Sequence, residues 1–327
     1  MKKETGMKFD DVGRIRGMEV LDLKNYFKGC YYKHQKENQT LCLIAGETRS
    51  ERFIQVITED FSKKIHFKKE RITEGKIIPE GGNYFSKRGV VLDIRTPELT
   101  LSGRIRYKNL SPIRYDIMGP FRFFPMECRH GIISMHHELE GEVLLNGRKI
   151  DFTGGNGYME MDSGRSFPSS YIWVQANDFS SGSLQQCRKG CSVMVSAASI
   201  PFYGLKFQGC ICVIHYQGKE YRLATYLGVK VLLCTKTQII LQQGKYRLEV
   251  RIKSENTQKL AAPQDGKMTR MILETVSCPA EFYFYQNGIC MFALYSEHAS
   301  FEYENEGGCE SVKNRSGKKS GKKSGKK

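Results

Sequence analysis

Apolar and polar residues alternate with a period of two through almost the whole chain, and no long stretch keeps the 3.6-residue period of a helix. The alternating runs are separated by turn residues. Asn146-Gly147 and Asn287-Gly288 have the sequence that best tolerates the positive φ angles of a two-residue hairpin turn. Gln217-Gly218 and Gln243-Gly244 are weaker versions of the same signal. The pattern predicts an all-β chain built of antiparallel hairpins.

The number of alternating runs favours two barrels over one sandwich. Roughly eight strands are expected in each half of the 327 residues, and eight antiparallel strands suffice to close a barrel that holds one small ligand. We therefore predict two consecutive lipocalin-like antiparallel β-barrels, at residues 21–165 and 166–309. Residues 1–20 form an N-terminal extension, and residues 310–327 form a tail.

The net charge of +16 is concentrated in that tail. The last fifteen residues, KNRSGKKSGKKSGKK, hold eight Lys or Arg and no acid, which leaves a modest excess of +8 on the rest. Because a repeated SGKK motif cannot bury apolar surface, we predict a disordered tail that is solvated or touches an anionic surface peripherally. The chain lacks the interleaved aromatic and basic residues of an RNA-binding surface, so no specific nucleic acid is expected.

The 11 cysteines are odd in number, and the nearest pairs, Cys187/Cys191 and Cys210/Cys212, lack the CxxC spacing of zinc and redox sites. This usage is typical of reduced thiols in a cytoplasmic protein, and no metal site is predicted. The N-terminus has no apolar signal core, and no run reaches the roughly 20 apolar residues of a membrane span.

One long segment carries a family resemblance. Residues 119–177 read GPFRFFPMECRHGIISMHHELEGEVLLNGRKIDFTGGNGYMEMDSGRSFPSSYIWVQAN, which resembles the signature of the tocopherol cyclase-like family, related to carotenoid hydratases with paired lipocalin-like barrels. YFKGCYYKHQ (26–35), RFIQVIT (52–58) and YRLATYLG (221–228) also look like family segments. The resemblance implies an apolar pocket and, by analogy with the plant enzymes, ring closure of a prenylated hydroquinone. This reaction is redox-neutral, so no cofactor is expected.

Two positions depart from the family pattern. Cys30 stands where the opening motif usually has Trp, and Ser163 stands where the family has the Trp of an Asp-Trp-Gly or Asn-Trp-Gly element. Trp173 is the one tryptophan of the chain. If the missing indoles line the pocket, the substrate or the chemistry differs from that of the family.

Ring closure by addition of a phenol across an alkene requires a buried acid, a partner for the phenol and a dry pocket. Burial can keep a carboxylic acid protonated near neutral pH. Asp162 is the first candidate acid and Glu160 the second, because they share one strand face just after the glycine-rich TGGNG. His137 and Tyr158 are the candidate catalytic partners. The adjacent His136 and His137 point to opposite faces of a strand, so they cannot chelate one metal.

A second group of residues is predicted to bind the ligand. Trp173, Gln175 and Asn177 alternate in YIWVQAN and therefore share a face. Arg165 and Phe167 belong to the GRSFP element between the halves. Arg165 could pair with Asp162 and hold it ionised, in which case Glu160 or Glu127 takes over as the acid. The predicted ligand-binding residues are Glu127, Arg165, Phe167, Trp173, Gln175 and Asn177.

Three functions remain open at this level, of which the third, binding of nucleic acid or membrane through the basic tail, rests on charge alone. The first is an intramolecular cyclase or hydratase acting on a prenylated hydroquinone or related isoprenoid, with a protonated carboxyl as the acid. The second is a non-catalytic carrier of a small hydrophobic molecule. The fold and the family do not choose between them.

Overall fold

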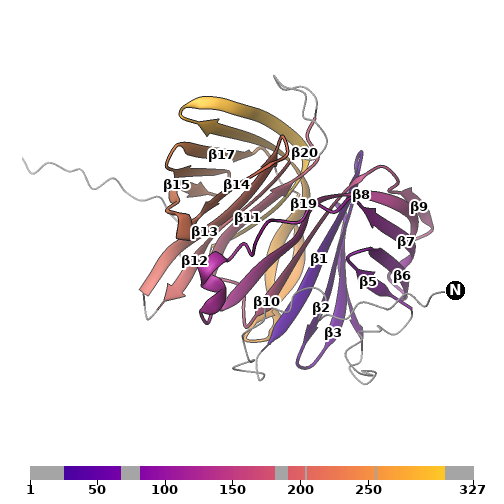
Figure 1. Ribbon diagram of the computed structural model, residues 1–327. Coiled ribbons are helices and arrows are strands. Elements are labelled where there is room, and N and C mark those ends of the chain that lie inside the picture. Colours follow the sequence, from indigo (N-terminus) through magenta and orange to yellow (C-terminus); the bar gives the residue numbers. More distant parts are fainter. Residues whose placement is uncertain (1–25, 68–81, 181–190, 203–204, 255, 306–327) are drawn as a thin grey trace, which may run out of the picture.

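The computed structural model describes residues 26–67, 82–180, 191–202, 205–254 and 256–305, and Figure 1 shows its two curled sheets side by side. Within these ranges the regular structure is antiparallel strand plus two short 3-10 helices, η2 (Gly119–Phe123) and η3 (Thr225–Leu227). The all-β prediction is confirmed. The predicted N-terminal extension (1–20) and basic tail (310–327) lie outside the described residues.

The first sheet has ten strands in the order β4-β3-β2-β1-β10-β8-β7-β6-β5, with β9 paired to β8. Its strands are β1 (Phe27–Lys36), β2 (Gln39–Thr48), β3 (Arg52–Ile57), β4 (Ser62–Phe67), β5 (Tyr84–Ser86), β6 (Gly89–Arg95), β7 (Thr100–Lys108), β8 (Cys128–Leu145), β9 (Arg148–Asp151) and β10 (Asn156–Gly164).

The second sheet repeats this arrangement in the order β14-β13-β12-β11-β20-β19-β17-β16-β15, with β18 paired to β19. Its strands are β11 (Ser170–Ala176), β12 (Ser192–Phe202), β13 (Leu205–Tyr216), β14 (Lys219–Ala224), β15 (Lys230–Thr235), β16 (Gln238–Gln243), β17 (Tyr246–Ile252), β18 (Gln258–Gln264), β19 (Lys267–Gln286) and β20 (Ile289–Asn305). Ten strands stand where roughly eight were predicted, because short strands such as β5 and β9 carry too few residues to show alternation.

Each sheet curls into a half-barrel with its own core, and a third core lies where the two sheets meet. Strand β1 contributes to both kinds of core, since Cys30 and Tyr32 face the interior of the first sheet while Tyr31 faces the second sheet. Strand β11 does the same for the second half, with Ile172 and Val174 inside and Trp173 at the junction. Strands β1 and β11 are therefore buried on both faces.

The predicted hairpin turns are present. Asn146 and Gly147 have φ angles of 50° and 81°, and Asn287 and Gly288 have 52° and 78°, as a type I′ turn requires. Gln217-Gly218 adopts the same conformation, with φ angles of 50° and 72°. At Gln243-Gly244 the positive φ is confined to Gly244, at 51°, because Gln243 is still the last residue of β16.

Two further observations concern the described part of the chain. No disulfide joins any two of its cysteines. None of its helices has the length and apolar character needed to cross a membrane.

Candidate active site between the two sheets

A cavity of about 130 Å³ opens at the junction of the two sheets. One wall comes from β8 and β10 of the first sheet, and the other comes from β11, β12, β13 and β20 of the second. Residues of η2 and η3 lie at one side of it. This cavity lies between the two sheets, whereas the sequence-based prediction placed a ligand inside one barrel.

The first wall carries a cluster of polar side chains. His130 lies beside Asp162 in the pairing of β8 with β10, and its Nδ1 is 2.9 Å from Asp162 Oδ1. Its Nε2 is 3.3 Å from Glu160 Oε2. The same Glu160 oxygen accepts a hydrogen bond of 2.5 Å from the hydroxyl of Tyr158. Tyr158, Glu160 and Asp162 share one face of β10, so one short strand delivers three members of this cluster.

Charge and burial act in opposite directions in this cluster. Burial alone would lower the pKa of His130, but the charges of Glu160 and Asp162 outweigh it and raise the pKa to about 9. Burial raises the pKa of Glu160 to about 7, helped by the charge of Asp162 and opposed by His130 and Tyr158. His130 is therefore an imidazolium at neutral pH. Glu160 can both hold and release a proton there.

The second wall offers another acid, which is partly buried. Tyr171 of β11 donates a hydrogen bond of 2.7 Å to Glu302 Oε2 of β20. Burial raises the pKa of Glu302 to about 8, and the charges of Glu160 and Asp162 across the cavity add to the rise. Trp173 lies beside Glu302 in the pairing of β11 with β20. Among the described residues its buried indole Nε1 makes no hydrogen bond of regular geometry, but a weaker interaction with Glu160 helps to lower the pKa of that carboxyl.

The rest of the lining is largely apolar and aromatic. Phe167 packs edge-on against Tyr171 at a centroid distance of 6.0 Å, and Trp173 is held by Tyr31 at 5.6 Å. Methionine, alanine and isoleucine side chains complete the walls. The site thus combines two opposed sets of carboxyls with a largely apolar, aromatic surround.

His130, Glu160 and Asp162 also have the residue types and spacing that a divalent cation could use, with one ligand atom of each within 4.8 Å of the others. Binding would require the imidazolium of His130 to lose its ring proton and the Tyr158–Glu160 bond to rearrange. The ion pair already neutralises part of this cluster.

Four of the predicted residues line the cavity: Glu160, Asp162, Phe167 and Trp173. Tyr158 reaches it through its bond to Glu160. Arg165 pairs with Asp265 at 3.0 Å rather than with Asp162. The prediction that Arg165 could hold Asp162 ionised therefore has the wrong cation. His130 takes that place at 2.9 Å.

Other predicted residues lie away from the cavity. His137 packs on Tyr107 at a centroid distance of 4.5 Å, beyond a shift in the β8–β10 register that breaks the alternation. Asn177 donates to the backbone carbonyl of Gly157 at 2.8 Å, and Gln175 is buried at the junction without lining the cavity. The exposed Glu127 side chain is also outside the lining.

Sequence reasoning missed His130, Tyr171 and Glu302. Tyr171 shares the face of Trp173 on β11, which is a signal that period-two counting could have used. Glu302 stands in the alternating run SFEYEN, but no local feature indicates that its strand returns beside β11. The two departures from the family pattern lie elsewhere, because Cys30 is in the first interior core and Ser163 does not line the cavity.

Comparisons with known proteins agree with this architecture. The structure of CghA in complex with Sch210972 matches with a TM-score of 0.52 at 8% identity, covering 86% of this chain and 88% of that one. The structure of CghA alone matches with a TM-score of 0.51 at 6% identity, with the same coverage. These values establish a shared fold. No curated protein sequence gives a significant match. The profile of the tocopherol cyclase-like family matches residues 99–301, which is more than half of the sequence, and the chain therefore belongs to the tocopherol cyclase-like family.

Proposed function

We propose that this protein is an intramolecular cyclase that closes a ring by adding a hydroxyl across an alkene of a prenylated hydroquinone or related isoprenoid. The observation that carries the proposal is the pair of carboxyls on opposite walls of one aromatic cavity, the buried Glu160 and the partly buried Glu302. Their surroundings differ. The His130 imidazolium lies 3.3 Å from Glu160, whereas within the described residues no cation is paired with Glu302. The cation beside Glu160 favours its carboxylate, whereas burial favours the neutral acid at Glu302, and this difference suits the two groups to base and acid roles.

In this mechanism Glu302 is the proton donor. Its pKa of about 8 keeps it protonated at neutral pH. Its O–H bond breaks as a new C–H bond forms on the alkene, which leaves a tertiary cation. Tyr171, Trp173 and Phe167 line the cavity, and aromatic rings of this kind stabilise a cation electrostatically. A hydroxyl oxygen of the substrate then attacks the cation and closes the ring.

Glu160 is the proton acceptor. As the new C–O bond forms, the hydroxyl proton passes to the Glu160 carboxylate, which His130 and Tyr158 hold in position. Asp162 acts as the counter-ion of His130 rather than as the acid. The substrate gains one proton and loses one, so the product is an isomer. Exchange with water after product release returns the proton from Glu160 to Glu302.

The experiment is incubation of the full chain with a prenylated hydroquinone in heavy water, followed by mass spectrometry. Ring closure leaves the mass unchanged in ordinary water, whereas in heavy water the protonated carbon keeps one deuteron. We expect a chromanol marked by one deuteron in the presence of the protein and none in its absence. Saturable binding without any marked product would refute the cyclase proposal and favour a carrier.

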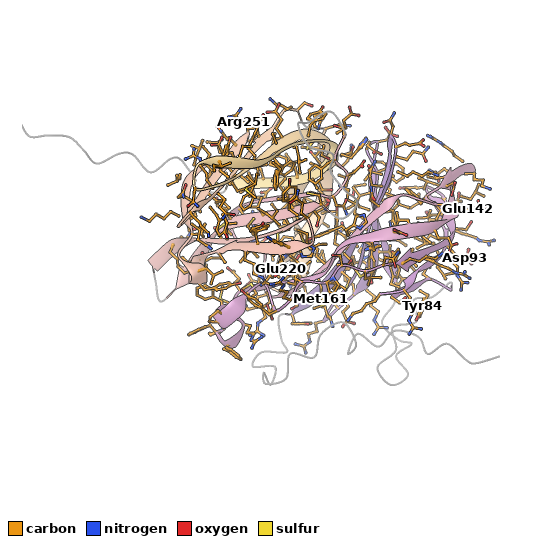
Figure 2. All side chains as sticks on the ribbon, turned by 45° about the horizontal axis from the view of Figure 1, so that its top comes forward. Tyr84, Asp93, Glu142, Met161, Glu220 and Arg251 are labelled. Carbon is orange, nitrogen blue, oxygen red and sulfur yellow. The ribbon has the colours of Figure 1, made fainter. Side chains whose placement is uncertain are left out.

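Single substitutions assign the roles. Glu302→Gln and Glu160→Gln each remove one proton-transfer group, which typically costs a factor of about 10²–10⁴ in turnover, while substrate binding is retained. Glu142→Gln is the matched control, because Glu142 is an exposed acid of β8 paired only with Lys149. Figure 2 shows Glu142 at the outer edge of the first sheet, away from the junction. Full turnover in both pocket variants would contradict the assignment.

A further inference from the structure

We propose that the side of the cavity formed by η2 and η3 docks on the surface of a lipid bilayer with anionic headgroups, so that an apolar substrate enters the cavity from the lipid. This goes beyond the proposed chemistry and would hold equally for a carrier. The occupant we name is the bilayer itself, and the argument rests on exposed apolar side chains, local charge and the size of the cavity.

Three exposed apolar side chains form what we call the rim: Phe123 (65% exposed), Phe124 (44%) and Leu227 (44%). The rim is continuous with the cavity lining, since Phe121 and Met126 on either side of the two phenylalanines line the cavity, and so does Thr225 at the start of η3. In Figure 1 η2 is the short magenta coil below β12, projecting from the junction of the sheets. Adjacent exposed phenylalanines at a pocket entrance mark an interaction surface.

The rim is held in place by the second sheet. Gly119 begins η2 with a φ of 53°, and a Cβ there would lie 2.6 Å from the ring of Tyr226 in η3. The Tyr226 hydroxyl donates a hydrogen bond of 3.0 Å to the carbonyl of Ile117, and Arg222 donates to the carbonyls of Tyr115 and Asp116. The phenylalanines are thus exposed on an anchored segment, and their exposure is a feature of the fold.

Basic side chains surround the rim. The Arg122 guanidinium lies 4.6 Å from the Phe123 ring centroid, and Arg129 donates to the carbonyl of Phe124 at 3.3 Å. Lys230 is exposed three residues after Leu227. Of the nearby acids, Asp116 accepts a hydrogen bond from the backbone of Met118, while Glu127 is exposed. Arginine next to exposed aromatic residues suits the interface of an anionic leaflet, because each basic residue adds to the attraction by the negative surface.

The size of the cavity gives an independent reason for a lipid partner. Its volume of about 130 Å³ is close to that of cavities that hold a single benzene ring. A long prenyl chain exceeds this space, so the part beyond the reacting atoms must extend along the rim. In water this part of the prenyl chain would be exposed to solvent, whereas at a bilayer surface it stays in hydrocarbon.

Vesicle sedimentation with the full chain tests the proposal. The double variant Phe123→Ser/Phe124→Ser should bind vesicles of phosphatidylcholine and phosphatidylserine at least about tenfold more weakly than the unsubstituted protein. Ile289→Ser is the matched control and should bind normally, because Ile289 is 70% exposed at the far β19–β20 hairpin. The basic tail is present in every variant, so its contribution cancels in the comparison. Equal binding of both variants would overturn the proposal.

A second measurement reports insertion directly. Phe123→Trp should lose fluorescence on vesicles that contain brominated lipid, above the background from the buried Trp173, whereas Ile289→Trp should not. Absence of quenching at Phe123→Trp would also overturn the proposal. If light scattering instead shows a dimer that the double serine variant dissociates, and vesicles are not bound, the rim is covered by a second copy of this chain.

Discussion

Glu274 is the buried group whose removal gives the sharpest test of the electrostatics at the junction. It lies on β19 directly opposite Glu302 in the β19–β20 pairing, and its side chain is fully buried. Within the described ranges neither carboxyl oxygen makes a hydrogen bond of regular geometry, although the Tyr31 hydroxyl interacts with the carboxyl more weakly. Burial raises the pKa of Glu274 to about 8, the charge of Glu302 adds to the rise, and Tyr31 and Lys33 offset it in part.

The expected effect follows from linkage. The folded state holds the Glu274 proton up to about pH 8, whereas the unfolded chain releases it near 4.5. The folded protein therefore binds more protons in this window, and the free energy of unfolding falls as the pH rises through it. A pKa difference of this size corresponds to about 5 kcal/mol. The free energy of unfolding is not reduced below the pKa of Glu274 in the unfolded chain. The reduction is complete above its pKa in the folded protein.

Glu274→Gln removes this titration. Relative to the unsubstituted protein, the variant should gain about 3–5 kcal/mol between pH 5 and pH 9, roughly two-thirds of it already by pH 7. The diagnostic quantity is the change in relative stability between pH 5 and pH 9. The buried glutamine amide of the variant does not titrate, so any destabilisation that it causes is the same at both pH values. Urea unfolding followed by the fluorescence of Trp173, the one tryptophan, measures it. Parallel pH profiles for Glu274→Gln and the unsubstituted protein would refute the reasoning, and Glu142→Gln supplies the exposed-acid control.

Four further outcomes are expected. Turnover should peak between about pH 7 and pH 8, because it requires Glu160 ionised and Glu302 protonated; a profile that keeps rising above pH 9 would exclude Glu302 as the donor. His130→Asn removes the cation that lowers the pKa of Glu160, so the acidic limb of the profile should move to higher pH, and an unmoved limb would exclude this pairing. Trp173→Phe should lower kcat by about tenfold, through loss of the indole N–H and of cation stabilisation, and unchanged single-turnover rates would show that the indole only packs. Treatment with EDTA should leave turnover unchanged, and its loss, restored by a divalent cation, would reassign His130, Glu160 and Asp162 as metal ligands.

Local physics explains which parts of this structure could be predicted. A two-residue turn such as Asn146-Gly147 depends on the φ preferences of its own residues, and period-two alternation alone places Glu160 and Asp162 on one face. Alternation does not say what covers that face. The pairing of Glu302 with Trp173 joins residues far apart in the chain, and no short-range signal encodes it. His137 was wrongly predicted to lie in the site. The prediction assumed regular alternation along β8, and a register shift in the β8–β10 pairing interrupts that alternation.

The internal repeat explains why two acids face one another at all. The two halves have the same strand order, so β10 and β20 occupy equivalent positions, and the outer faces that meet at the junction carry Glu160 and Glu302. The neighbours of these acids break the equivalence: Glu160 has the His130 imidazolium within 3.3 Å, whereas the charges that raise the pKa of Glu302 are those of other acids, Glu160 and Asp162 among them. A cationic neighbour favours the carboxylate and an acidic neighbour favours the neutral acid. Duplication thus accounts for the pair of carboxyls, and the few residues that differ between the halves account for the separation into acceptor and donor.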